Sequence, residues 1–147
     1  MNKPRTVEFI VYGEPVGQGR GRATYKNGRT WVYDPAKSRN FKQWVRLCAI
    51  QTVKKINDFK PFQNACVVDV CFYRSIPISW NKTKRMQAAE GLIRPTTKPD
   101  CGNYEKGFYD ALNGVIWVDD SIVTDKHVKK RYTADLARVE IKVTEVQ

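Results

Sequence analysis

The chain has 147 residues, of which 26 are Lys or Arg and 15 are Asp or Glu, so its formal net charge is +11. This length predicts one domain over residues 1–147, and the charge favours nucleic acid as the partner, although a generic basic surface is the alternative. Four cysteines without CxxC spacing and a single histidine disfavour a zinc site. No apolar window approaches the roughly 20 residues of a membrane span, so we expect a soluble, cytoplasmic protein with reduced thiols.

The N-terminal part predicts a strand and a hairpin. Residues 6–12 alternate between apolar and polar side chains, as a half-buried strand does. Further on, Asn27-Gly28 lies between two short β-favouring pieces, which predicts a type I′ hairpin. Basic residues cluster around it and suit phosphate binding, although an ordinary solvated loop explains them equally well: Arg20, Arg22, Lys26 and Arg29.

A long helix is expected next. Asp34-Pro35 reads as an N-cap followed by a first helical residue, and Asn57-Asp58 precedes a proline. The pattern predicts a helix of about 23 residues. Its expected buried stripe comprises Phe41, Trp44, Val45, Cys48, Thr52 and Ile56.

The remaining elements predict a mixed sheet. Ala65–Tyr73 is apolar on both sides, which is typical of a central strand. Residues 79–92 have a capping serine or asparagine and a stop at Gly91, which predicts a helix. Ser121–Tyr132 and Arg138–Val146 alternate and are expected to pair as antiparallel strands. We therefore expect an α/β (α+β) fold with two layers, a mixed β-sheet packed against helices.

The stretch between residues 98 and 120 carries the candidate chemistry. Asn103 is the expected N-cap of a short helix that ends at Asn113-Gly114, which places Asp100 just before the helix. Lys106 is expected in the first turn, where its ammonium and the helix dipole favour an approaching phosphate. The alternative for Lys106 is a structural ion pair with Asp110, four residues on.

Two further acids, Asp119 and Asp120, follow the apolar run Val115–Val118, which we expect to be a strand. Carboxylates that converge in a protein would repel one another unless a divalent cation lay between them, and oxygen ligands suit Mg²⁺, with Mn²⁺ as a substitute. We therefore expect Asp100, Asp119 and Asp120 as metal ligands for phosphodiester hydrolysis. Acid-rich turns are also common without any metal.

These residues resemble a motif of the RusA family of Holliday-junction resolvases from bacteria and their phages, KPDxDNxxKxxxDAL followed by DD. The matching residues are Lys98, Pro99, Asp100, Asn103, Lys106, Asp110, Ala111, Leu112, Asn113-Gly114 and Asp119-Asp120. Residues 14–22 are similar to the family's GxPxxKxRPR. The resemblance implies a homodimeric, Mg²⁺-dependent endonuclease that makes paired nicks in four-way DNA junctions. It implies that Asp100 and Asp120 are metal-binding catalytic acids and that Lys106 is the catalytic lysine.

The chain departs from the family pattern at Gly102, where the family has its second aspartate, and also at Gln18 and Gly21. A glycine offers no side-chain ligand, so catalysis is expected to be weakened or lost. Glu105, three residues on and further into the expected helix, is the candidate to replace it. Either the natural protein diverged at Gly102, or the change was selected during cloning.

Two other functions fit the same features. One is a protein that binds branched DNA without cutting it, and the other is a single-strand binder that stacks bases on Tyr25, Trp31 and Tyr33. We expect DNA contacts from Arg20, Arg22, Lys98, Lys129 and Arg131, although ordinary surface charge is the alternative for each.

Overall fold

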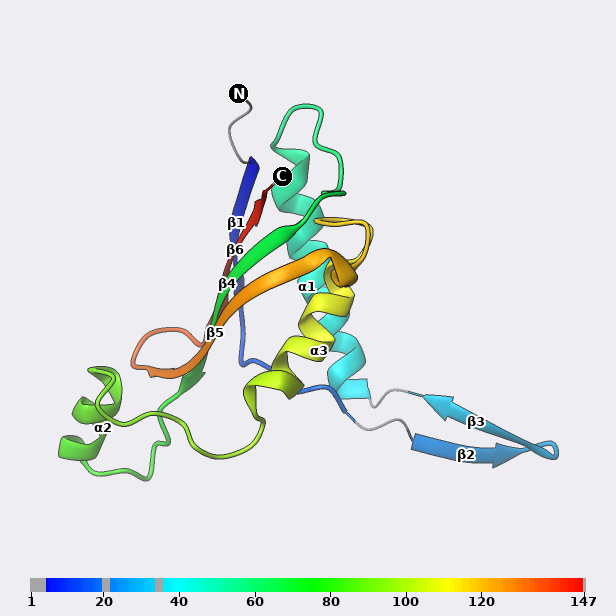
Figure 1. The fold of residues 1–147 in the computed structure, drawn as a ribbon. Coiled ribbons are helices and arrows are strands. Elements are labelled where there is room, and N and C mark those ends of the chain that lie inside the picture. The colour runs from blue at the N-terminus through cyan, green and yellow to red at the C-terminus, as the bar shows by residue number, and fades with distance from the viewer. Residues whose placement is uncertain (1–4, 20–21, 34–35, 147) are drawn as a thin grey trace.

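The computed structural model describes residues 5–19, 22–33 and 36–146, and it shows a sheet with helices on one face and a projecting hairpin (Figure 1). The sheet has the order β1-β6-β4-β5. Its strands are β1 (Arg5–Tyr12), β4 (Cys66–Ser75), β5 (Val123–Thr133) and β6 (Arg138–Glu145). The other elements are β2 (Arg22–Lys26), β3 (Arg29–Tyr33), α1 (Ala36–Lys54), α2 (Lys82–Ala89), α3 (Cys101–Leu112) and the short 3₁₀ helix η1 (Asp120–Ile122). The expected α+β fold with a mixed sheet is confirmed.

The strand pairing differs from the expectation in one place. β5 and β6 were expected to pair with each other, but β4 lies between them, parallel to β5 and antiparallel to β6. β4 takes the centre because its residues are apolar on both sides, whereas β5 exposes its polar residues 124–127 and therefore suits an edge. The long connection from β4 to β5 contains α2 and α3, as a parallel pair requires.

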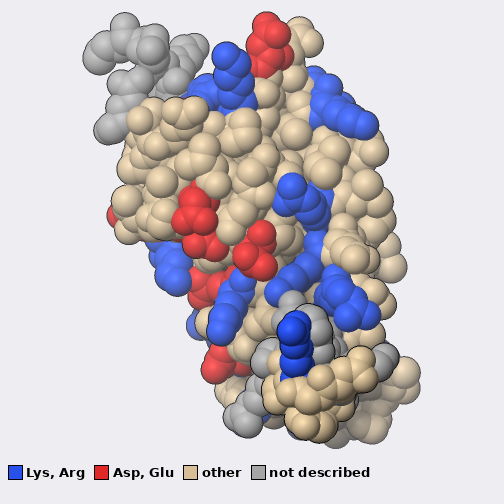
Figure 2. Space-filling view, turned by 90° about the vertical axis from the view of Figure 1, so that its right-hand side faces the viewer, with Lys and Arg blue, Asp and Glu red and all other residues tan. Residues whose placement is uncertain are grey.

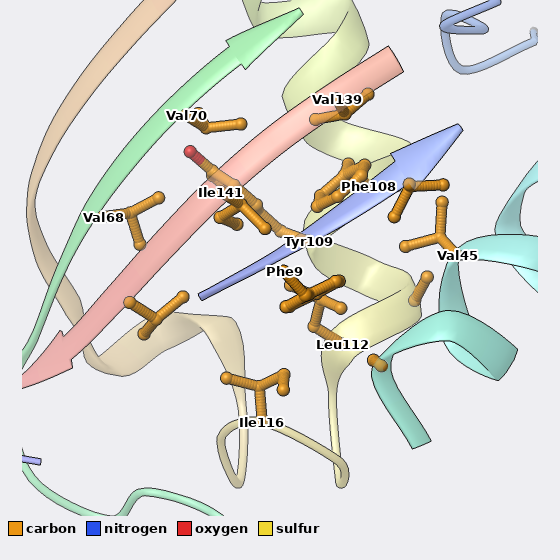
Figure 3. Packing of buried hydrophobic residues seen from close by; sticks show 14 of the residues in the cluster. Phe9, Val45, Val68, Val70, Phe108, Tyr109, Leu112, Ile116, Val139 and Ile141 are labelled. Carbon is orange, nitrogen blue, oxygen red and sulfur yellow. The ribbon is translucent and has the colours of Figure 1, made fainter. Parts of the chain in front are cut away.

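The core lies between the sheet and the pair α1 and α3 (Figure 3). The alternation predicted for β1 is confirmed, because Val7, Phe9 and Val11 are buried and their neighbours are exposed. The buried set also includes Val68, Val70, Phe108, Leu112, Val139 and Ile141. This core fixes α3 on the sheet face beside β5, where the candidate site is found.

α1 is shorter than expected, and its buried stripe is shifted. The helix ends at Lys54 after 19 residues, since residues 55–58 turn away before the following extended segment. Val45 and Ala49 are fully buried, but Trp44 is 45% exposed and Ile56 39% exposed. The sheet edge explains Trp44, whose indole N–H donates to the Tyr12 carbonyl at 2.8 Å.

One predicted turn and one predicted helix cap are confirmed. Asn27 and Gly28 both have positive φ, 54° and 73°, as the two central residues of a type I′ turn must. The Asn81 side chain caps α2 by accepting from the Lys84 amide at 2.9 Å. The expected cap at Asp34-Pro35 and the residue Arg20 lie outside the described residues. Within the described ranges no helix is long and apolar enough to cross a bilayer.

Candidate active site

The first turn of α3 is built by Asp100. Its Oδ1 accepts from the Asn103 amide at 2.7 Å, so Asp100 is the N-cap and the helix begins at Cys101. The expected cap at Asn103 is therefore wrong. Aspartate caps as well as asparagine does and comes earlier in the chain, so the helix gains three residues at its start. As a consequence Lys106 lies in the second turn of α3 and not in the first.

Two basic side chains hold the segment that leads into Asp100. Arg74 of β4 donates to the carbonyls of Thr97 and Pro99 at 3.1 and 3.0 Å, and to the Thr97 hydroxyl at 3.0 Å. Lys130 of β5 donates to the same two carbonyls at 3.0 and 3.2 Å. Hydrogen bonds from charged donors are the stronger kind. The position of Asp100 is thus fixed by the two neighbouring strands.

The glycine-containing loop before the hairpin packs against α3. The Gln18 amide donates to the Asn103 carbonyl at 3.0 Å. A Cβ at Gly17 would lie 2.6 Å from Asn103 Nδ2 and 2.8 Å from Pro99 Cβ, so only glycine permits this approach. The loop that resembles the family's early motif therefore lies beside the first turn of α3.

Between α3, η1 and β5 is a hollow of about 300 Å³, here called the α3–η1 hollow. It brings together two of the predicted catalytic residues, Lys106 and Asp120, with Gly102 and Glu105. The sequence analysis did not single out its other lining residues, Tyr109, Val123 and Lys126. Asp100 lies beside it, because a Cβ at Gly102 would be 3.7 Å from Asp100 Oδ1.

The acid pair Asp119-Asp120 follows a turn. The strand expected over Val115–Val118 is not formed. Residues 115–117 are buried, and the Phe62 amide donates a hydrogen bond to the Ile116 carbonyl at 2.9 Å. Gly114 with a φ of 78° makes this compact turn possible. Asp119 is exposed and caps η1 through the Ser121 amide at 3.0 Å. The hydrogen bonds from Ser121 lower the pKa of Asp119, and Asp120 is the carboxylate of the pair that lines the hollow.

Glu105 is buried at the α3–η1 hollow with only 7% of its surface exposed. Its Oε2 accepts from Lys126 Nζ at 2.7 Å, and the Lys126 side chain is 55% exposed. Burial raises the pKa of Tyr109, and the nearby Glu105 carboxylate raises it further. The Tyr109 hydroxyl has no hydrogen bond of acceptable geometry within the described residues. Figure 3 shows this hydroxyl pointing away from α3, toward the strands.

Lys106 and Asp110 do not form the ion pair considered as the alternative. Asp110 instead lies 3.6 Å from Lys42 Nζ of α1. Lys106 is exposed, and it faces the α3–η1 hollow. Its side chain is thus placed to meet a ligand there.

The expected DNA contacts are spread over both faces of the sheet. Lys98 is exposed and precedes Asp100 by two residues. Lys129 lines a second hollow, of about 560 Å³, on the sheet face opposite α3, and Arg131 shares that face by strand alternation. On the other face of β5, Lys126 reaches Glu105 of α3 and Lys130 reaches the segment just before α3. The same alternation could have identified these two, because they lie in register with the apolar Val128 and Tyr132. Arg20 and the Arg22 side chain lie outside the described part of the structure.

The family model of endodeoxyribonuclease RusA matches residues 12–144. The chain belongs to the RusA family. It is also 46% identical over 142 residues to the uncharacterized protein YqaN of Bacillus subtilis (strain 168), which covers 95% of this chain and 96% of YqaN. RusA-family endonucleases resolve Holliday junctions, act on branched DNA and generally use a divalent metal ion. The matched residues include every residue that lines the α3–η1 hollow.

The RusA family's metal dependence can be tested against the donors at the α3–η1 hollow. Within residues 5–19, 22–33 and 36–146, no three side chains of the types His, Cys, Asp or Glu gather closely enough to hold one ion. Among these residues a cage of three carboxylates is therefore absent. Two carboxylates, Glu105 and Asp120, do line the hollow, and Mg²⁺ is commonly bound through one or two carboxylates with water and phosphate oxygens. The donors fit a loosely held ion that substrate completes.

The surface around the hairpin side of the molecule carries both signs of charge. Figure 2 shows acidic side chains gathered on this face, with Lys and Arg side chains on several sides of them. A cationic surround attracts a phosphate backbone, whereas the acids within it suit a cation. This pattern is compatible with a nuclease that must approach DNA and still bind a metal.

Proposed function

We propose that the chain is a homodimeric, structure-selective endonuclease that resolves four-way DNA junctions by paired, Mg²⁺-dependent phosphodiester hydrolysis. We further propose that Gly102 weakens this activity. The observation that carries the proposal is the α3–η1 hollow, where Lys106 and Asp120 face the same space and Asp100 caps the adjoining helix. Membership of the RusA family supports this class of reaction, and the residues that line the hollow support it as the proposed active site.

The roles of the residues follow from their charges. Lys106 offers an exposed ammonium to a phosphate, and it would offset negative charge that develops in the transition state. Asp100 and Asp120 would be the acids that hold the metal ion. When bound, Mg²⁺ supplies an activated water and polarises the phosphate. Asp119 would hold the η1 turn in place, which orients Asp120.

The proposed dimer follows from the substrate. A four-way junction has two-fold symmetry, and two symmetric nicks need two equivalent sites. DNA contacts from Lys98, Lys129 and Arg131, and from Arg20 and Arg22, would then come from both subunits. The net charge of +11 supports DNA binding whose affinity falls as the salt concentration rises, because the release of counterions from the phosphate backbone becomes less favourable.

A second candidate is a protein that binds branched DNA and does not cut it. Gly102 favours this reading, because it removes a potential ligand beside Asp100. The same charge pattern would serve binding alone, so only cleavage separates the two candidates.

The test uses a labelled four-way junction, a linear duplex of equal length and a single strand, each at moderate salt, with and without Mg²⁺ or Mn²⁺. We expect a clear preference for the junction and slow, metal-dependent nicks on two opposing strands. Junction preference without nicks, even after Gly102→Asp, would favour the non-cleaving protein. Equal binding of all three DNAs would overturn both candidates and favour a general single-strand or backbone binder.

A further inference from the structure

We propose that Glu105 and Asp120 form the divalent-cation site of this chain, and that the Lys126 ammonium occupies Glu105 until the cation displaces it. This inference rests on the proposed metal dependence. It keeps Asp120, which the family motif contains, and gives the role of the second metal ligand to Glu105, which the motif does not contain, in place of Asp100. Glu105 lies three residues after Gly102 on α3, and Lys126 enters the hollow from β5. Divalent cation and ammonium would thus compete for one carboxylate.

Burial explains why Glu105 needs a cation at all. Its exposed fraction is 7%, and a buried carboxylate is costly unless a positive charge pairs with it. Lys126 supplies that charge at 2.7 Å. Its own side chain is 55% exposed and flexible, so it can turn into solvent when another cation takes its place. An arginine fork or a buried lysine would not be released so easily.

The Tyr109 hydroxyl is a separate sign that the hollow is built for a ligand. Tyr109 lines the hollow and is 8% exposed, and its buried hydroxyl, which is close to Glu105, makes no hydrogen bond of acceptable geometry among the described residues. Buried hydroxyl groups normally find a partner, because leaving one unpaired costs free energy. Water bound to a cation held by Glu105 and Asp120 would donate a hydrogen bond to the oxygen of this hydroxyl.

The number of ligands suits Mg²⁺ or Mn²⁺ without a third acid. Such ions keep several waters and are often bound by one or two carboxylates together with substrate phosphates. Asp120 is half-buried, and among the described residues its carboxylate accepts one long hydrogen bond, from Asn113 Nδ2 at 3.5 Å, so its oxygens remain available. Once displaced, the ammonium of Lys126 stays near the hollow, where it joins Lys106 as a possible phosphate contact.

The test measures Mn²⁺ binding by calorimetry with the full chain and no DNA. Lys126→Met removes the competitor, and we expect Mn²⁺ to bind roughly tenfold tighter or more than to the unmodified chain. Lys126→Gln, which keeps a hydrogen-bonding group, should also raise the Mn²⁺ affinity, and it replaces Lys126→Met in the test if that variant does not fold. Lys142→Met is the matched control, since it removes one positive charge from an exposed residue on the opposite sheet face and should leave Mn²⁺ affinity unchanged.

A double variant locates the site. Adding Glu105→Gln to Lys126→Met should abolish the gain in Mn²⁺ affinity. The proposal is overturned if Lys126→Met and Lys126→Gln leave the affinity unchanged, if no variant binds Mn²⁺, or if the gain survives Glu105→Gln. Cleavage reports separately on the proposed function: the expected Mn²⁺ pattern without nicks on any junction would retain this site and reject the nuclease. Nicks by Gly102→Asp without the expected Mn²⁺ pattern would retain the nuclease and reject this cation site.

Discussion

Replacing Gly102 with aspartate should restore a carboxylate beside Asp100 without disturbing the fold. A Cβ at Gly102 would meet only Asp100 Oδ1 within 4 Å, at 3.7 Å, so there is room for the side chain. Gly102 is the second residue of α3, where a negative charge interacts favourably with the helix dipole. The new carboxylate would therefore face Asp100 at the edge of the α3–η1 hollow.

The opposing contributions to the free energy of unfolding are of similar size. Aspartate gains about 0.3 kcal/mol over glycine in helix propensity and about 0.3–1 kcal/mol from the dipole. Repulsion between two carboxylates about 4 Å apart in water costs about 1 kcal/mol. Without metal, the unfolding temperature should therefore change by no more than about 4 °C. With Mg²⁺ at about 100 times its Kd, the variant should gain about 2.7 kcal/mol.

The assay compares Gly102→Asp with Gly102→Asn, which has the same shape without the charge. Mg²⁺ should stabilise Gly102→Asp more than Gly102→Asn in thermal unfolding, and Gly102→Asp should nick a four-way junction about 100-fold faster or more than the unmodified chain. If the aspartate variant is folded and binds the junction, yet gains neither Mg²⁺ stabilisation nor cleavage, the assignment of Gly102 as a lost ligand position is refuted.

Three other variants test separate parts of the structure. In the Gly102→Asp background, Lys106→Met should lower the cleavage rate about 100-fold with little change in junction affinity, and an unchanged rate would remove Lys106 from the chemistry. Arg74→Met should cost about 2–3 kcal/mol of unfolding free energy in urea titrations, because Arg74 holds residues 97–99; a loss below about 0.5 kcal/mol would contradict this. Burial raises the pKa of Glu145, but the hydrogen bonds from Arg5 and two backbone amides outweigh it, so the pKa is lowered from 4.5. The stability from Glu145 is then present above pH 4.5 and lost as the pH falls through the lowered value, so urea midpoints of Glu145→Gln should depend less on pH in that window.

Much of the fold could be predicted because local patterns and tertiary packing agree. The alternation in β1 and the Asn27-Gly28 turn are local signals, and both are confirmed. Strand order was harder, because the pairing of β5 with β4 depends on which strand can be buried on both faces. Trp44 shows the same limit, since helical periodicity cannot tell a core position from the rim of a sheet.

The candidate site was predicted in part from residue spacing. Lys106 and Asp120 share the α3–η1 hollow, as their motif suggested, but the N-cap of α3 was placed three residues too late. Lys126 and Tyr109 were missed because they come from a strand edge and from the buried side of α3. Neither position carries a motif, and their relation to Glu105 exists only after β5 and α3 pack together.

The most direct test of the central claim is cleavage of a labelled four-way junction with Mg²⁺ by Gly102→Asp and by Gly102→Asp combined with Asp120→Asn. The account predicts paired nicks on opposing strands with the first protein and at least about 100-fold slower nicks with the second, at similar junction affinity. Equal cleavage by both proteins would show that the reaction does not use Asp120, and the α3–η1 hollow would no longer be the active site.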